Sequence, residues 1–166
     1  MTQPRPATPP DSALSLLNGR HVATLATQRA DGSIHLAAIW FLYDGGILYF
    51  PTNSSSQKAR NVARTPTASA MIDTRVPGQE QGVSVSGHAT IVDGPQGRAL
   101  VAQTQRRYLT TKALNESNVG ATYAEFDDVV IALTPERWTT WDIARMNQST
   151  FGGILGVESG YLYPYD

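Results

Sequence analysis

Apolar and small polar residues alternate along this chain in short segments that are separated by turn residues. Segments 21–27, 34–43 and 47–50 alternate with a period of two, which is typical of strands that bury one face. Asp31-Gly32 and Asp44-Gly45 lie between these segments, and both pairs favour tight hairpin turns. The first third of the chain therefore predicts an antiparallel meander.

Four more strand segments are predicted after residue 66. They cover residues 67–74, 83–92, 126–133 and 137–143. Gly87 interrupts the alternation of the second segment and marks a predicted β-bulge, whereas Thr134-Pro135 is expected to split the last two segments into a strand pair. Six or seven short strands at this spacing favour a closed antiparallel barrel over a sandwich or a parallel sheet.

Only short helices are predicted between these strands. Asp11 is a candidate cap for a helix that ends at Asn18-Gly19. A second helix should end at Thr65-Pro66, because proline disfavours a helical residue before it. A third is expected from residue 94 to about residue 112, after Asp93. Residues 113–125 and the last twenty residues have no clear period.

The chain of 166 residues is long enough for one domain and short for two. Residues 1–10 contain four prolines, so we expect a flexible N-terminal arm. Residues 11–144 then form the predicted cofactor-binding domain. Residues 145–166, rich in glycine and tyrosine, are expected to be a C-terminal tail that reaches a partner subunit or stays mobile.

Composition and charge exclude several classes of protein. The chain has a formal net charge of -1, which does not indicate a nucleic-acid-binding protein. It has no cysteine, which excludes disulfides and thiolate metal sites. No apolar run reaches the roughly 18 residues that a membrane span needs, and the first residues do not resemble a signal peptide. We therefore expect a cytoplasmic protein that binds no membrane.

The segment "YFPTNSSSQKARNVARTP", residues 49–66, carries the most specific chemistry. Ser54 or Ser55 is predicted to cap the helix that follows, which would leave its first amides free for an anion. Lys58 falls in the first turn, where a cation is unfavourable for the helix itself. Residues 45–72 contain no acid, and Lys58, Arg60 and Arg64 are all cationic. This segment predicts a phosphate or carboxylate site, although a solvated surface helix would show the same pattern.

Other polar residues do not predict a metal site or an acid–base pair. His21, His35 and His88 lie singly on predicted strands, so we expect no metal site. The acidic residues Asp127 and Asp128 precede an apolar segment, and we interpret them as part of a turn that protects a sheet edge rather than as an acid–base pair.

The order Thr52-Asn53-x-x-Ser56-x-Lys58-Ala59, followed by Asn61-Val62 and Thr65-Pro66, resembles the signature of the FMN-binding split-barrel superfamily, the pyridoxamine 5'-phosphate oxidase-like proteins. The order of strands is similar as well, and the resemblance spans roughly residues 12–143. It implies a mainly β fold, a split β-barrel of six or seven antiparallel strands in a Greek-key arrangement, with short flanking helices.

The resemblance also implies which residues form the site. Ser56 and Lys58 would hold the cofactor phosphate, Thr52 would lie beside the ring or its ribityl chain, and residues 37–40 would line the ring face. The expected cofactor-binding residues are Ala38, Ile39, Trp40, Thr52, Asn53, Ser55, Ser56, Gln57, Lys58 and Asn61. A homodimer with cofactor sites at the subunit interface is implied too.

The cofactor follows from how the chain departs from the family pattern. Oxidases of the family that use FMN carry further basic residues, where this chain has "LAAIW" on the second strand and Gln57 before the lysine. The sequence is more similar to the branch that uses the deazaflavin coenzyme F420, so F420 is favoured and FMN is the alternative. An F420-dependent oxidoreductase that transfers a hydride to or from an unsaturated small molecule is the expected function. An FMN-dependent oxidase or reductase, and a flavin-, haem- or tetrapyrrole-binding protein without turnover, remain open, and no catalytic residue is assigned.

Overall fold

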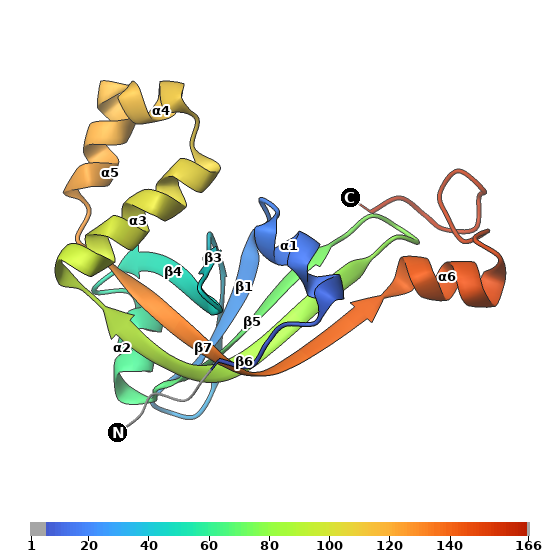
Figure 1. The fold of residues 1–166 in the computed structure, drawn as a ribbon, viewed down its shortest axis with the longest axis horizontal. Helices are drawn as coiled ribbons and strands as arrows, with labels where there is room; N and C mark the ends of the chain where they lie inside the picture. Colours follow the sequence, from blue (N-terminus) through green and yellow to red (C-terminus); the bar gives the residue numbers. More distant parts are fainter. Residues whose placement is uncertain (1–5, 166) are drawn as a thin grey trace.

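The computed structural model describes residues 6–165, and its body is one curled antiparallel sheet (Figure 1). The strands are β1 (Ala23–Gln28), β2 (Ile34–Ile39), β3 (Leu42–Asp44), β4 (Ile47–Asn53), β5 (Thr67–Thr74), β6 (Gln81–Val92) and β7 (Asp128–Asp142). Their order across the sheet is β2-β1-β5-β6-β7-β4-β3. The mainly β fold predicted from the sequence is confirmed.

The connection between β2 and β3 explains why the sheet curls. These two strands lie at opposite ends of the strand order, yet only Trp40 and Phe41 separate them along the chain. Three Cα–Cα steps from Ile39 to Leu42 span at most about 11 Å, so the end of β2 must lie close to the start of β3 at the other margin of the sheet. The single strand predicted over residues 34–43 is therefore wrong: the chain breaks at Trp40-Phe41 and passes from one margin to the other.

Alternation of apolar residues places the core inside this curl. The side chains that are fully buried there include Leu25, Phe41, Phe50, Ile72, Val85 and Leu133. Each comes from a strand or from the β2–β3 connection, so the pattern that predicts the strands also forms the core.

The helices are short and lie around the sheet. They are a 3₁₀ turn (Asp11–Ala13), α1 (Leu14–Asn18), α2 (Gln57–Arg64), α3 (Gly94–Tyr108), α4 (Thr111–Asn115), a π-helix (Ser117–Ala121), α5 (Thr122–Glu125) and α6 (Ile143–Phe151). Figure 1 shows α2 and the projecting α3–α5 group at one end of the sheet and α6 at the other. No helix within residues 6–165 has the length and apolar character needed to cross a bilayer.

The predicted break at Thr134-Pro135 is wrong, because β7 runs through it as one strand. Ser86 pairs with Arg137, whereas Gly87 pairs with Pro135, so Glu136 is an extra residue on β7. This bulge at Gly87, which the sequence predicted, accommodates the proline without ending the strand. A Cβ at Gly87 would lie 2.0 Å from the Thr134 carbonyl oxygen, so the close approach requires glycine.

Residues 6–10 and 143–165 form hydrogen bonds with other described residues. The predicted arm lies partly outside the described residues, since it includes residues 1–5. Within residues 6–10, the Ala7 amide donates to the Pro135 carbonyl at 2.8 Å, and the Trp138 indole donates to the Ala7 carbonyl at 2.9 Å. At the other end, α6 was not predicted, and its Asn147 amide exchanges hydrogen bonds with the backbone of Leu155.

Candidate cofactor site

The turn between β4 and α2 is held by side chains of its own segment. The Asn53 Oδ1 accepts from the Ser55 amide at 3.0 Å and from the Ser55 hydroxyl at 2.6 Å. This Asx turn delays the start of the helix, so the N-cap is Ser56 and not Ser54 or Ser55 as expected. Asn53 and Ser55 therefore shape the loop in front of the helix.

Ser56 joins the end of β4 to the first turn of α2. Its Oγ accepts from the Ala59 amide at 3.2 Å and from the Thr52 hydroxyl at 3.0 Å. Thr52 is buried and its position is fixed by the strand. A serine hydroxyl has two lone pairs and one proton. Because both lone pairs are in use, the Ser56 proton is available to an anion in front of the helix.

Lys58 follows in the first turn and is half-buried. Within residues 6–165 its ammonium forms no ion pair, since the one ion pair there joins Arg75 to Asp73. Burial lowers the pKa of Lys58, and the charge of Asp128 opposes that shift. The Gln57 and Lys58 amides lie before the first intrahelical bond, which runs from the Arg60 amide to the Ser56 carbonyl. The first turn of α2 thus carries one lysine and two backbone amides without an intrahelical acceptor.

The two arginines of α2 are already engaged. Arg60 donates to the Ser55 carbonyl and, at 3.1 Å, to the Gln57 side chain. Arg64 donates to the Gln28 carbonyl. Both guanidinium groups therefore stabilise the backbone around α2, which leaves Lys58 as the cation of this helix without a protein partner among the described residues.

Asn61 anchors α2 to the sheet from the side opposite the solvent. It is fully buried, and its amide donates to the Thr27 hydroxyl at 3.0 Å while its Oδ1 accepts from Gln57 at 2.8 Å. In the structure the side chains of Asn61 and Gln57 thus position the helix, and their contact with a cofactor stays a prediction.

Ala38, Ile39 and Trp40 line a cavity of about 330 Å³ beside this turn. The cavity is also lined by Pro51 of β4 and by residues of α3 and α5. The Trp40 ring stacks on Tyr108, which does not line the cavity, with ring centroids 4.9 Å apart and an interplanar angle of 3°. Tyr123, which does line it, lies with its ring centroid 6.4 Å from that of Trp40. Of the residues predicted to line the ring, Ala38, Ile39 and Trp40 thus share one cavity, and their contact with a cofactor ring stays a prediction.

Sequence reasoning missed the residues that contact Trp40 and Phe41. Tyr108 accepts a bond from the Phe41 amide at 3.3 Å and donates to the His21 carbonyl at 2.6 Å. The Arg107 guanidinium lies 5.3 Å from the Phe41 ring centroid and donates to the carbonyls of Leu17 and Gly19. These contacts join residues that are far apart in the sequence, so no local pattern indicates them.

Asp128 was missed as well, although its position in the sequence was noted. Asp127 turns toward the β4–α2 loop, where it accepts from the Ser54 hydroxyl. Asp128, the next residue, lines the 330 Å³ cavity. Burial raises the pKa of Asp128, Asp127 raises it further, and Lys58 opposes the shift. The pair is therefore more than protection for a sheet edge.

Comparison with known proteins agrees with this geometry. Residues 10–142 match the family described as pyridoxamine 5'-phosphate oxidase. The chain belongs to this family. Its resemblance to the family, inferred from residues 52–66 and the order of strands, is thereby confirmed, and the match includes both the turn at Ser56 and the β2–β3 connection that carries Trp40.

Individual members of the family differ in their similarity to the chain. The F420H(2)-dependent biliverdin reductase of Mycobacterium tuberculosis is 43% identical over 60 residues, which is 35% of this chain and 44% of that protein. The aligned segment thus spans less than half of that relative. A solved F420 reductase is 29% identical, with a TM-score of 0.60 over 78% of this chain and 98% of its own.

A conserved hypothetical protein of Mycobacterium tuberculosis shares the fold over a larger part of the chain. Its structure has a TM-score of 0.69 at 24% identity and covers 89% of this chain and 93% of its own. The likeness confirms the seven-stranded architecture and carries no statement about activity.

Proposed function

We propose that this protein is an F420-dependent oxidoreductase that transfers a hydride between the reduced deazaflavin and an unsaturated small molecule. The observation that carries the proposal is the half-buried Lys58 in the first turn of α2, which forms no ion pair within residues 6–165. Asp128, whose charge acts on Lys58, lines the cavity that also includes Trp40. The two relatives that are named for F420 support the same cofactor class.

The residues present fit an anionic, flat-ringed cofactor. Lys58, the Ser56 hydroxyl proton and the amides of Gln57 and Lys58 supply donors for one phosphate group, an arrangement that suits helix N-termini. The cavity of about 330 Å³ lies at the small end of the usual range for ligand pockets, roughly 300–1,000 Å³. It therefore suits the ring system, with the rest of the cofactor extending along α2.

The bound cofactor would supply the hydride, and the protein would supply its position and surroundings. Ala38 and Ile39 present a narrow apolar surface of β2, and Trp40 presents an aromatic one. These residues would fix the plane of the ring and keep water from one side of it. Thr52, held by its bond to Ser56, would orient the chain between ring and phosphate.

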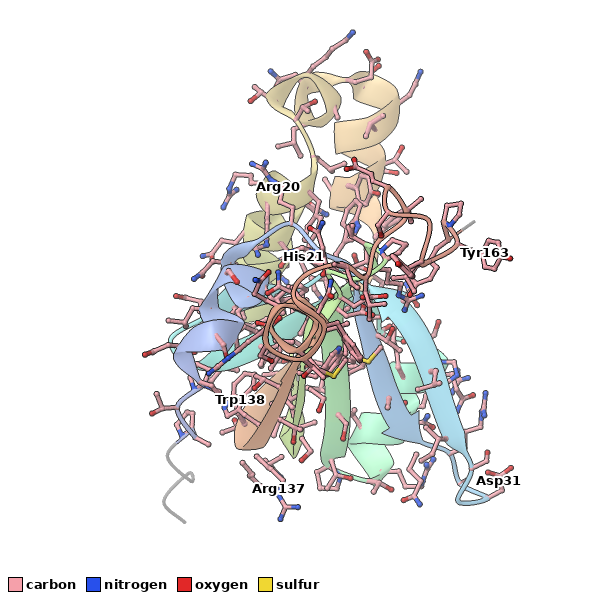
Figure 2. The ribbon with its side chains drawn as sticks, turned by 90° about the vertical axis from the view of Figure 1, so that its right-hand side faces the viewer. Arg20, His21, Asp31, Arg137, Trp138 and Tyr163 are labelled. Carbon is pink, nitrogen blue, oxygen red and sulfur yellow. The ribbon has the colours of Figure 1, made fainter. Side chains whose placement is uncertain are left out.

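We propose further that the protein is a homodimer and that each cofactor site lies at the subunit boundary. Ile34 and Leu36 point outward from β2 and are 57% and 63% exposed, and Val22 is 52% exposed. β2 lies at a margin of the sheet, beside the hairpin whose tip carries Asp31 (Figure 2). Val22 and the exposed Ala38 also line the cavity, so a second copy that covers this stripe would complete its wall.

Two features of the C-terminal tail are compatible with a role in that contact. Tyr161 and Tyr163 are 64% and 91% exposed, and Figure 2 shows Tyr163 extending away from the body. We propose that these rings pack on a partner subunit. Mass measurement in solution tests the dimer: Leu36→Glu should yield a monomer, and a wild-type monomer at micromolar concentration would contradict it.

Turnover tests the proposed function. Purified protein is incubated under anaerobic conditions with reduced F420 and a panel of conjugated acceptors that includes biliverdin, and coenzyme oxidation is followed by absorbance. We expect oxidation well above a protein-free control with at least one acceptor. Tight binding of the coenzyme without oxidation across the panel would instead support a binding protein.

A further inference from the structure

The cofactor cavity has a neighbour with which it shares a wall. A second cavity, of about 250 Å³, lies between α3 and α5 and is lined by Arg98, Ala102 and Phe126 among others. Both cavities are lined by Val101, Gln105, Tyr123 and Asp128. Asp128 is the one acidic side chain among the residues that line either of them, so its charge acts on whatever the site holds.

The backbone fixes the direction of this carboxylate. Asp128 begins β7 and pairs with Asn53 at the end of β4, directly before the turn into α2. Asp127 is used on the other side, where it accepts from Ser54 and its carbonyl accepts from the Ser54 amide at 2.9 Å. Because successive strand residues point to opposite faces, Asp128 turns toward the cavity. It forms no ion pair in the part of the chain that the structure describes.

Few charges surround Asp128. From α2, Lys58 acts on it as an opposite charge, and from its own strand Asp127 acts as a like charge. From α3 and α5 the groups that share its cavities are Arg98, which is exposed, and the phenol of Tyr123. Burial and Asp127 disfavour the charged form of Asp128, whereas Lys58 favours it. Lys58 and Asp128 thus lie close enough for their charges to act on one another, although no ion pair joins them among the described residues.

This arrangement sets how much negative charge the site accepts. The charges of the Lys58 ammonium and the Asp128 carboxylate largely cancel. A bound anion would therefore meet little net positive charge. A phosphate monoester such as that of FMN carries close to two negative charges at neutral pH, since its second pKa is about 6. A phosphodiester such as that of F420 carries one. The second charge of a monoester would have no cation to meet and would be repelled by Asp128.

We propose that Asp128 is the residue that selects the cofactor: its carboxylate excludes phosphate monoesters from the Lys58 site and leaves it open to phosphodiesters. The proposal rests on the proposed function, because it assumes that the Lys58 site holds the cofactor phosphate. The Asp128 carboxylate would repel the doubly charged phosphate of FMN, whereas Lys58 and the helix amides attract a phosphate. Repulsion of this kind lets a protein discriminate between two similar ligands.

The test compares FMN with riboflavin, which has the same ring and no phosphate. The ratio of their affinities, measured by fluorescence titration, isolates the contribution of the phosphate. In the wild type we expect a ratio close to one. In Asp128→Asn the ratio should rise about tenfold, because the repelling charge is removed while the shape is kept. F420 affinity should change by no more than about threefold, since its phosphate carries a single charge.

Three variants make the result specific. Asp128→Glu keeps the charge and should keep the wild-type ratio. Glu125→Gln removes an exposed charge three residues away and should leave the ratio unchanged, which controls for net charge. Lys58→Met should lower the affinity for F420 and leave riboflavin binding intact.

Each outcome separates this inference from the proposed function. An unchanged ratio in Asp128→Asn, or a wild-type ratio of ten or more, would overturn the selection by Asp128 while F420 binding stands. If wild-type protein binds neither F420 nor FMN, the proposed cofactor site itself fails, and the selection fails with it.

Discussion

The β4–α2 turn and the α3–α5 group lie at the same end of the sheet but are built differently (Figure 1). α2 is eight residues long and buries Ala59, Asn61 and Val62 against the strands. α4, the π-helix and α5 together bury no residue. α2 is therefore part of the core, and α3 packs Leu100 and Val101 against Val130 of β7. The segment from α4 to α5 contributes nothing to the core.

Their hydrogen bonds differ in the same way. The α2 side chains reach strand residues far away in sequence, as Asn61 does to Thr27. In the α4–α5 segment the bonds are local, for example from the Ala113 amide to the Thr110 hydroxyl at 3.2 Å. Segments with few buried contacts open at low free energy. Under the proposed function, the rigid α2 region would hold the cofactor, and the α4–α5 segment would be free to adapt to the acceptor.

The largest effect should come from Lys58. Lys58→Ala removes the charge that binds the phosphate, and the affinity for F420 should fall by about 1.5 to 3 kcal/mol, which is roughly 10- to 150-fold. A titration that follows coenzyme fluorescence measures it. Arg64→Ala is the control. Arg64 is the last residue of α2, at the end opposite to Lys58, so this change should alter the affinity little. Equal affinity for F420 in Lys58→Ala and wild type would mean that α2 does not bind the cofactor.

Asn61 tests whether α2 is anchored in the core. Asn61→Ala leaves Thr27 and Gln57 without their partner, and the free energy of unfolding should drop by about 2 kcal/mol. Urea denaturation measures this loss. The paired control is Asn118→Ala in the π-helix, an exposed asparagine whose replacement should change stability by less than about 0.5 kcal/mol. The same loss in both variants would remove the distinction between the two regions.

Tyr123 tests the acceptor end. Tyr123→Ala should raise the KM for a conjugated acceptor by about fivefold, or about 1 kcal/mol, because a stacking surface beside Trp40 is lost. The unfolding free energy should stay near wild type, since α5 buries no residue. Steady-state kinetics with F420 held at saturation provides the KM. A large loss of stability in this variant would show that the segment from α4 to α5 contributes to the core.

The smallest effect concerns pH. Burial raises the pKa of Asp128 in the folded state above its ordinary 3.8, so ionising it costs stability as the pH rises from about that value through the folded pKa. Asp128→Asn removes that cost. The variant should therefore melt slightly above wild type at pH 7 to 8, and the gain should shrink near pH 4. A gain that is equally large at both pH values would be inconsistent with this sign.

The sequence predicts the local parts of this structure well. Alternation and turn pairs indicate the strands, and the segment at residues 49–66 indicates a capped helix with Lys58 in its first turn. The cap itself was misplaced, since the Asn53 side chain competes for Ser55 and shifts the helix start to Ser56. Short-range patterns thus locate an element within a residue or two.

The remaining features depend on contacts between distant residues. The stack of Trp40 on Tyr108 joins a strand connection to the end of α3, and β7 continues past Pro135 because of a bulge opposite Gly87 on another strand. The position of Asp128 beside the cavity depends on its pairing with Asn53. None of these is encoded in a periodicity that can be read along one segment.

The account depends on one claim, that the donor end of α2 binds the phosphate of a deazaflavin cofactor. A parallel titration of the wild-type protein with F420 and with FMN tests it directly. We predict saturable binding of F420 that is at least tenfold tighter than that of FMN. Binding of FMN that equals or exceeds that of F420, or no saturable binding of F420, would contradict the account.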